Sequence, residues 1–259
     1  MNAAAFWIAH GDRYIAEAEE SAKSLRRHMP DVARILITPG VDLRGVAAKR
    51  RREAARTRVQ TFNEVIGMAN PEPGAPWYEF SIECFRWAGE NLCAPLIEPT
   101  PDVLINLDVD TLVVQPFYDL LEVLERFDLV GTHAPARYTS MTVGHVPDAF
   151  CEINLGMMAF RNSEKMQRVL RQWARRYRTH QDVYADNDQA SLRETLWTTA
   201  EDVRIWIAPP EYHFRFPFGG FARYPVKVLH GRSERYGIEE VAQRVNNPLG
   251  MRIWKKGEL

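Results

Sequence analysis

Two aspartates, Asp108 and Asp110, follow the apolar run 103–107 (VLINL) and precede a second apolar stretch. In an extended chain, residues i and i+2 point to the same side, so both carboxylates can face one point. Carboxylate oxygens at the exit of a buried strand suit Mg²⁺ or Mn²⁺, and these ions commonly bind together with a phosphate. The alternative is a pair of solvated aspartates in a turn, because the D-x-D spacing alone is a weak pattern.

Two other polar pairs stand beside predicted elements. Asn154 and Gly156 lie at the head of the apolar strand predicted over 155–160, where a glycine permits close backbone approach to a ligand. Asp188 and Gln189 open a predicted helix, at a position where aspartate also serves simply as an N-cap. A turn and a cap are therefore the structural alternatives to a ligand-binding role.

A late histidine and an early polar loop complete the set. His230 ends the strand predicted over 226–229, and its imidazole could complete a carboxylate site for Mn²⁺, although a lone histidine is more often structural. Arg232 follows closely and could neutralise a phosphate. Tyr14 follows the first predicted strand, where a nucleotide commonly lies and where its ring offers an aromatic face.

Apolar periodicity and chain punctuation predict alternating strands and helices, and the strand–helix–strand opening indicates a parallel sheet with a right-handed crossover. The predicted strands are 6–9, 33–38, 103–107, 129–132, 155–160, 203–208 and 226–229. The predicted helices are 12–28, 46–65, 77–92, 117–126, 163–178, 189–197 and 238–245. We expect one α/β domain over residues 1–259, with the tail 237–259 as a helical appendage.

Composition and charge exclude several classes of function. The 259 residues are 46% hydrophobic and 26% charged with a net charge of −1, so no global field attracts the chain to nucleic acid. Three cysteines without a C-x-x-C motif argue against a disulfide framework and a zinc site, and favour a reducing compartment. No apolar run reaches the roughly 18 residues of a membrane span, and no signal peptide is recognisable, so a cytoplasmic location is expected.

Two segments carry weaker signals. The predicted helix 46–65 has a cluster of basic side chains within 49–58. This cluster is either a solvated face or a contact with an anionic acceptor or lipid headgroup, the latter placing the protein peripherally at the inner face of a membrane. The segment 137–148 has little pattern and is expected to be a mobile lid that orders over a bound donor.

Taken in order, these motifs resemble those of GT-A fold nucleotide-sugar glycosyltransferases, and most of all the glycogenin-like glycosyltransferase family 8. The resemblance covers residues 6–232. Members of this family bind a UDP-sugar and Mn²⁺ and transfer the sugar with retention of configuration. The resemblance therefore implies a single GT-A (Rossmann-like) domain, a Mn²⁺ (or Mg²⁺) cofactor, a UDP-glucose or UDP-galactose donor, and a glycan or lipid-linked acceptor hydroxyl.

The resemblance also implies a role for each matching residue. The implied metal ligands are Asp108, Asp110 and His230. The implied catalytic residues, beside the transferred sugar, are Asp188 and Gln189. The implied donor-binding residues are Ile8, His10, Gly11, Tyr14, Arg86, Asn106, Asp108, Asn154, Gly156 and Arg232. The chain departs from the family after the late histidine, where arginines stand in place of the usual Lys-Pro-Trp, so an arginine is expected to hold the donor pyrophosphate.

Three alternatives remain open at the level of the sequence. A haloacid-dehalogenase-type phosphatase also uses a D-x-D-x-T loop, but that loop usually lies on the first strand, and Leu112 stands where its pattern needs Thr or Val. A relative that binds nucleotide sugars without transferring them would keep the same ligand types. An inverting transferase would need a general base near the acceptor. The carboxylates that could serve as that base are Asp148, Glu152, Asp186 and Glu211.

Overall fold

The structure is a computed structural model that describes residues 1–39, 61–68, 77–91, 100–135, 143–184, 187–247 and 251–259. Its strands are β1 (Ala3–Ile8), β2 (Ala33–Pro39), β3 (Glu64–Met68), β4 (Val103–Leu107), β5 (Thr111–Val113), β6 (Leu129–His133), β7 (Ile153–Arg161), β8 (Ile205–Ala208), β9 (Gly220–Ala222), β10 (Val228–His230) and β11 (Arg252–Trp254). Its helices are α1 (Asp12–His28), α3 (Trp77–Asn91), α4 (Tyr118–Val123), α5 (Glu164–Thr179), α6 (Gln181–Tyr184), α7 (Asp188–Thr198) and α8 (Ile238–Asn246), with short 3-10 turns η2 (Pro210–Tyr212) and η3 (Phe216–Phe218).

The central sheet contains seven strands in the order β3-β2-β1-β4-β7-β6-β8. Strands β3, β2, β1 and β4 are parallel, β7 is antiparallel to both of its neighbours, and β8 is parallel to β6. The prediction of an α/β fold with a mostly parallel central sheet is confirmed. Strand order reverses beside β1, and ligands of open α/β sheets bind at the carboxyl ends of strands at such a point.

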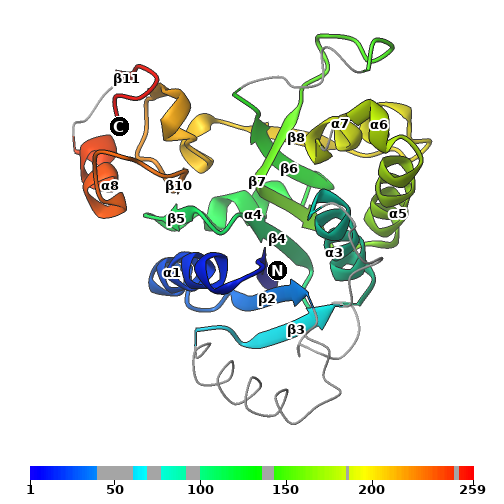
Figure 1. Cartoon of the computed structure of the whole chain (residues 1–259), viewed down its shortest axis with the longest axis horizontal. Helices are drawn as coiled ribbons and strands as arrows, with labels where there is room; N and C mark the ends of the chain where they lie inside the picture. The colour runs from blue at the N-terminus through cyan, green and yellow to red at the C-terminus, as the bar shows by residue number, and fades with distance from the viewer. Residues whose placement is uncertain (40–60, 69–76, 92–99, 136–142, 185–186, 248–250) are drawn as a thin grey trace.

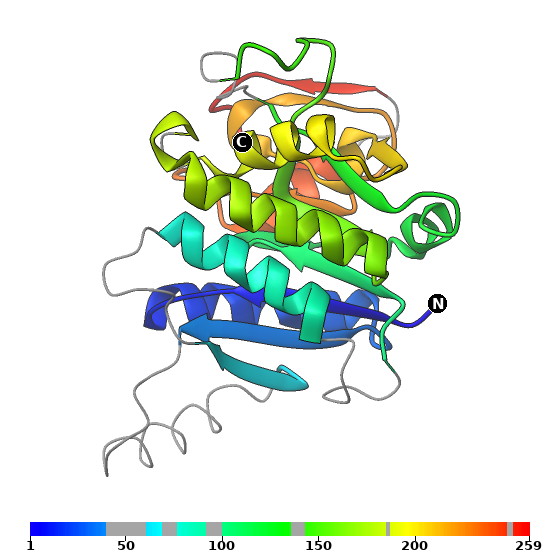
Figure 2. The same ribbon diagram turned by 90° about the vertical axis from the view of Figure 1, so that its right-hand side faces the viewer.

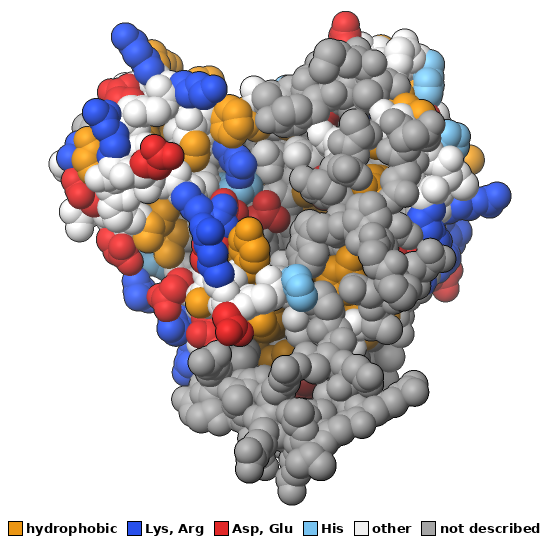
Figure 3. Space-filling view, in the orientation of Figure 1, with side chains coloured by type: hydrophobic (Ala, Val, Ile, Leu, Met, Phe, Trp, Pro, Cys, Tyr) orange, Lys and Arg blue, Asp and Glu red, His pale blue; other side chains and the backbone are white. Residues whose placement is uncertain are grey.

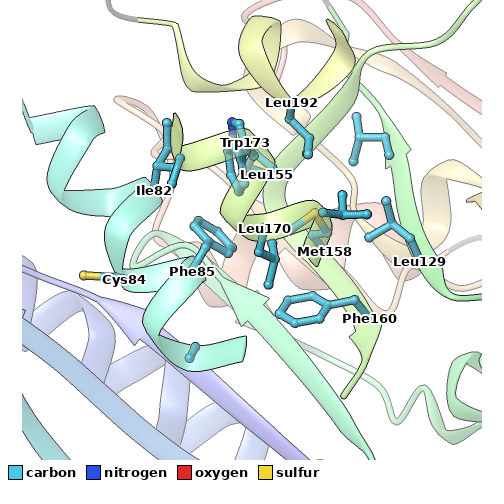
Figure 4. Close-up of a cluster of buried hydrophobic side chains, with 14 of the residues drawn as sticks. Ile82, Cys84, Phe85, Leu129, Leu155, Met158, Phe160, Leu170, Trp173 and Leu192 are labelled. Carbon is cyan, nitrogen blue, oxygen red and sulfur yellow. The ribbon is translucent and has the colours of Figure 1, made fainter. Parts of the chain in front are cut away.

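Helices cover both faces of the sheet. Figure 1 shows α3, α5, α6 and α7 on one side and α1 on the other, and Figure 2 shows α3 and α5 lying side by side across their face. Under α3 and α5, the rings of Phe85 and Trp173 lie 5.1 Å apart, and Phe160 of β7 faces the same cluster (Figure 4). Burial of these large apolar side chains is the main source of free energy that holds the layers together.

The opposite face is tied to the site through two buried serines of α1. Ser21 accepts a hydrogen bond from the Trp7 indole at 2.9 Å and shares a second one of 2.8 Å with the Thr111 hydroxyl. Ser24 accepts from the backbone N–H of Val113 at 2.9 Å. Helix α1 therefore fixes the position of β5, which is the strand that leaves the D-x-D turn.

The C-terminal part forms a third small core around β10. Val241 and Val245 of α8 pack with Leu229 and with Leu259 at the end of the chain, and β11 pairs antiparallel with β9. The helix predicted over 238–245 is confirmed as α8, but the tail 237–259 is not helical throughout, because residues 252–254 form a strand. The three-residue strands β9 and β11 are too short to give a readable alternation in the sequence.

Three other predictions need comment. The helix predicted over 46–65 is wrong at its end, because Glu64–Met68 form the parallel edge strand β3. The mixed exposure of this strand gives no clear period in the sequence. The basic cluster 49–58 lies outside the described residues. The described part of the expected lid is anchored, since Val143 and Val146 are buried and Arg193 donates to the Pro147 carbonyl at 2.7 Å. Among the described helices, none is long and apolar enough to cross a membrane.

Candidate metal and donor site

The two aspartates occupy the turn that connects β4 with β5. The backbone N–H of Asp108 donates to the Gly156 carbonyl at 2.9 Å, and the Thr111 hydroxyl donates to the Asp108 carbonyl at 2.7 Å. The Thr111 N–H adds a bond of 3.1 Å to the same carbonyl. These bonds hold the turn backbone, so both carboxylate side chains remain available to a ligand.

Pairing between β5 and β10 brings the late histidine to this turn. Thr111 lies opposite His230 in the antiparallel ladder, and the Gly231 N–H donates to the Asp110 carbonyl at 3.0 Å. The imidazole Nε2 of His230 then lies 3.4 Å from Asp108 Oδ2 and 3.2 Å from Asp110 Oδ1. One potential ligand atom from each of the three residues lies within 4.8 Å of the others.

This donor set fits a divalent cation. Two carboxylates and one imidazole combine hard oxygen ligands with a nitrogen that Mn²⁺ accepts. Burial opposes ionisation of Asp110, but contacts with His230 and with the Arg232 guanidinium outweigh burial, so the pKa of this carboxyl lies well below its usual range. The Asp110 carboxylate is therefore charged at neutral pH and ready to bind a cation.

A second histidine, His213, lies directly behind the first. Its Nε2 is 2.5 Å from Nδ1 of His230, and its Nδ1 is 2.8 Å from the Thr132 hydroxyl. Burial, with the adjacent His230 and Arg215, lowers the pKa of His213 well below its ordinary range, so this imidazole is neutral at pH 7. The sequence analysis missed His213, whose only local signal was its place in the aromatic segment 212–224.

Gly156 makes room for this histidine pair. A Cβ at residue 156 would lie 2.1 Å from Cε1 of His230 and 2.8 Å from Nε2 of His213. The register between β6 and β7 shifts between Gly131 and Thr132, and this irregularity leaves residues 155–157 unpaired with β6. The glycine of the N-x-G pattern is therefore required by packing against His230.

A cavity of about 250 Å³ opens on one side of the aspartates. The predicted site residues that line it are Ile8, Asn106, Asp108, Asn154, Gly156, Asp188, Gln189 and His230, and the unpredicted ones are Ser81, Phe85, Leu155 and Arg215. Within it, the Asn106 amide donates to the Leu155 carbonyl at 2.6 Å, and Asn154 Oδ1 accepts from the Gly156 N–H at 2.9 Å. Eight of the predicted residues thus meet in one concave space at the sheet edge.

Helix α7 presents its first turn to this cavity. Asn187 is the N-cap, because its side chain accepts from the Ala190 N–H at 3.0 Å. The capping role considered for Asp188 therefore falls to its neighbour, and Asp188 and Gln189 face the cavity instead. Burial, and after it the negative charge of Asp108, raises the pKa of the Asp188 carboxyl to about 7.

A second cavity of about 430 Å³ also borders the aspartates. It is lined by His10, Tyr14, Asp108 and Asp110, together with Ile8, which it shares with the first cavity. Gly11 between them has φ +84 as the N-cap of α1, a backbone conformation that favours glycine. The first-strand loop thus forms a polar and aromatic wall next to the candidate metal site.

Three arginines differ in their relation to the site. Arg232 bonds Asp110 at 3.1 Å, pairs with Glu17 and lies over the Tyr14 ring, and Arg215 contacts Nε2 of His230. Arg86, by contrast, donates to Glu83 at 2.6 Å and does not line either cavity. Figure 3 shows basic, acidic and histidine side chains gathered left of the centre on this face.

Comparison with solved structures places this geometry in a known fold. The chain is similar to the galactosyltransferase LgtC in complex with donor and acceptor sugar analogues (17% identity, TM-score 0.61, 95% of this chain and 96% of that chain). It is also similar to the glycosyltransferase GlyE of Streptococcus pneumoniae TIGR4 (14%, TM-score 0.59, 95% and 60%) and to mouse xyloside xylosyltransferase 1 (12%, TM-score 0.53, 90% and 98%). No protein-family model and no curated protein matches the chain.

These similarities show that the chain has the GT-A fold, as the resemblance to the family 8 enzymes implied. The fold removes the basis for the phosphatase alternative, because the aspartates follow the fourth strand and face a histidine. Among the described residues, Cys84 and Cys151 are free cysteines.

Proposed function

We propose that this chain is a metal-dependent glycosyltransferase that moves a hexose from a nucleotide sugar, most simply UDP-glucose or UDP-galactose, to an acceptor hydroxyl. The observation that carries the proposal is the position of the Asp108, Asp110 and His230 cluster, because it borders two different cavities. A nucleotide sugar has a base at one end, a sugar at the other and a charged diphosphate between them. The site offers an aromatic wall for the base, a polar enclosed cavity for the sugar and a cation site for the diphosphate.

The two cavities divide the donor between them. Tyr14 is 46% exposed and lines the larger cavity beside His10, which supports stacking of a nucleobase on its ring. The smaller cavity, with Asp188 and Gln189, would enclose the sugar. Asp108 lines both cavities, so the diphosphate that joins base and sugar would lie at the aspartates.

The residues around the diphosphate supply positive charge. A cation held by Asp108, Asp110 and His230 would act as a Lewis acid for the departing nucleoside diphosphate. Arg215 lines the smaller cavity and Arg232 bonds Asp110, so both guanidinium groups can donate to phosphate oxygens at the aspartates. Arg86 is bonded to Glu83 and lines neither cavity. Arg215 and Arg232 take the place of the lysine that the family 8 pattern would provide.

We infer transfer with retention of configuration, as the resemblance to the family 8 enzymes implies, and the position of Glu211, one of the candidate bases for inversion, supports this. Glu211 is 4% exposed and accepts from the backbone N–H groups of Arg223 and Tyr224 at 2.6 and 3.0 Å, so it anchors its own loop. Asp186 lies outside the described residues. Asp188, in contrast, faces the sugar cavity, where its ionised form would stabilise positive charge at the anomeric carbon.

We further propose that the acceptor is a glycan or lipid-linked hydroxyl, which enters past the aromatic segment 212–224, and that transfer takes place in the cytoplasm. Tyr224 is 61% exposed and Phe221 is 53% exposed in this segment. Aromatic faces of this kind stack on sugar rings. The support for this acceptor path is the chemical complementarity between exposed aromatic rings and sugar rings.

The first test is a thermal-shift screen of nucleotides and nucleotide sugars, each with Mn²⁺ and with EDTA. A ligand that binds only the native state raises Tm by mass action. We expect UDP or one UDP-sugar to raise Tm with Mn²⁺ and not with EDTA. A metal-dependent shift with another nucleotide would reject the UDP assignment, and no shift with any nucleotide would reject the donor site.

The second test is Asp110→Asn, with the exposed Asp202→Asn as a control outside the cavities. We expect Asp110→Asn to abolish transfer and donor hydrolysis while Tm stays close to the wild-type value, since the amide keeps the shape of the carboxylate. Asp202→Asn should behave as wild type. Full activity of Asp110→Asn in EDTA would contradict metal dependence.

A further inference from the structure

The two ring nitrogens of His230 face different partners. Nε2 faces the carboxylates of Asp108 and Asp110 at 3.4 and 3.2 Å, and the guanidinium of Arg215 contacts the same nitrogen. Nδ1 points away from the cavity to Nε2 of His213, at 2.5 Å. His213 therefore does not belong to the candidate ligand set, but it contacts the one ligand that can carry its proton on either nitrogen.

The neighbours Arg215, His213 and Thr132 together favour one position for the proton of each ring. A guanidinium has donors only, so Nε2 of His230 accepts from Arg215 and the proton of the neutral imidazole is on Nδ1. That N–H donates to Nε2 of His213, whose own proton must then be on Nδ1. The His213 N–H donates to the Thr132 hydroxyl oxygen at 2.8 Å. This arrangement satisfies the contacts with Arg215, His213 and Thr132. It leaves Nε2 of His230 without a proton opposite two carboxylates, and such a group of acceptors calls for a cation among them.

We propose that His213 is a positioning residue, which holds the proton of His230 on Nδ1 and thereby leaves Nε2 unprotonated for the metal. The inference rests on the proposed metal site. A metal-binding histidine commonly donates its second N–H to a fixed acceptor, which sets both the tautomer and the ring orientation. Here the acceptor is another histidine, and Thr132 orients that histidine in turn.

The surroundings leave few other partners for the ring of His230. His213 and His230 are 4% and 2% exposed, so solvent does not compete for the bond between them. Thr132 stands where the β6–β7 register shifts, next to the stretch that contains Gly156. The absent side chain at Gly156 is what allows both rings to lie against β7.

The test is a calorimetric titration of Mn²⁺ into wild-type protein, His213→Ala and His213→Gln, without nucleotide. We expect His213→Ala to weaken Mn²⁺ binding about 10- to 100-fold, the range found for lost partners of metal ligands. His213→Gln should recover most of the affinity, because the amide oxygen can accept from Nδ1 of His230 while the amide N–H₂ donates to Thr132. The matched control is His133→Gln, since His133 bonds the Ala134 carbonyl outside both cavities.

The outcomes separate this inference from the proposed function. If wild type binds Mn²⁺ and a folded His213→Ala binds it equally well, the positioning role is overturned while the metal site stands. If wild type itself does not bind Mn²⁺, the metal site fails and the inference fails with it. Nitrogen NMR of wild-type protein gives a second readout that needs no variant: a His230 ring protonated on Nε2 alone would overturn the inference even if His213→Ala does not fold.

Discussion

Replacement of Gly156 by alanine would place a methyl group against the histidine pair of the candidate metal site. The added Cβ would lie 2.1 Å from Cε1 and 2.3 Å from Nδ1 of His230, and 2.8 Å from Nε2 of His213. An ordinary van der Waals contact begins at 3.4 Å, so the His230 ring or the strand has to move by more than 1 Å. Both rings are buried and cannot swing into solvent.

The size of this displacement sets the expected effect. Metal–ligand distances in working sites vary by only about 0.2 Å, so a shift of this size removes His230 from a shared ligand position. We expect Gly156→Ala to weaken Mn²⁺ binding about 10- to 100-fold. We also expect a loss of about 1–3 kcal/mol in the free energy of unfolding, as for other overpacked cores.

The assay is Mn²⁺ titration together with urea unfolding of the apoprotein. Gly144→Ala is the matched control, because a Cβ at residue 144 would meet nothing within 4 Å. It should leave both quantities unchanged. Gly156→Ala should also be compared in a His230→Ala background, where most of the clash is gone and its cost in unfolding free energy should fall. Wild-type Mn²⁺ affinity in Gly156→Ala, or an equal cost in both backgrounds, would refute the reasoning.

Two further predictions concern stability and nucleoside binding. Burial alone would raise the pKa of the Asp128 carboxyl. Hydrogen bonds from the Arg204 backbone N–H and the Lys165 ammonium, at 2.8 and 2.9 Å, lower it by more, so the pKa in the folded state is depressed. The stabilisation by this carboxylate is therefore fully present above the ordinary Asp pKa of about 3.9 and is lost as pH falls through the folded value. Asp128→Asn should lose about 1–3 kcal/mol of unfolding free energy at pH 7 and less in acid, and a deficit in urea unfolding that does not shrink between pH 6 and pH 2 would contradict this. Tyr14→Ala should weaken UDP binding about tenfold or more in calorimetry with Mn²⁺ present, from the loss of about 1–3 kcal/mol of stacking, while Mn²⁺ affinity stays unchanged; equal UDP affinity would exclude Tyr14 from the nucleoside site.

Long periodic elements and strand-end motifs could be read from the sequence. Helix α1 has its predicted bounds, and Ser163 caps α5 by accepting from the Met166 N–H at 3.3 Å. The pair Asp108 and Asp110 follows its predicted strand. These features depend on local apolar spacing and capping chemistry, which neighbouring residues determine.

The rest depends on pairing between distant segments. Strand β5 has three residues and gives no period. Only its register with β10, which was predicted as a strand over 226–229, brings His230 to the turn. His213 is held by two backbone bonds next to it, from the Phe214 N–H to the Val228 carbonyl and from the His230 N–H to the Phe214 carbonyl. No local pattern could show that His213 would lie behind His230 or that Arg215 would line the cavity beside the aspartates.

The elements that fix the positions of the three candidate metal ligands differ from the helix that closes the proposed sugar cavity. Strand β5 leaves the turn that holds both aspartates, and β10 ends at the histidine, so the register of one short ribbon fixes the spacing of all three ligands. Helix α1 holds that ribbon through its buried serines, and it also carries Tyr14. The sugar side is built largely from β7, a strand of the central sheet, and from α7, which lies on the face of the sheet opposite α1 (Figure 1). Substitutions in α7 can therefore reshape the sugar cavity without disturbing the ligand distances, since function in such folds lies in sites that vary on a fixed frame.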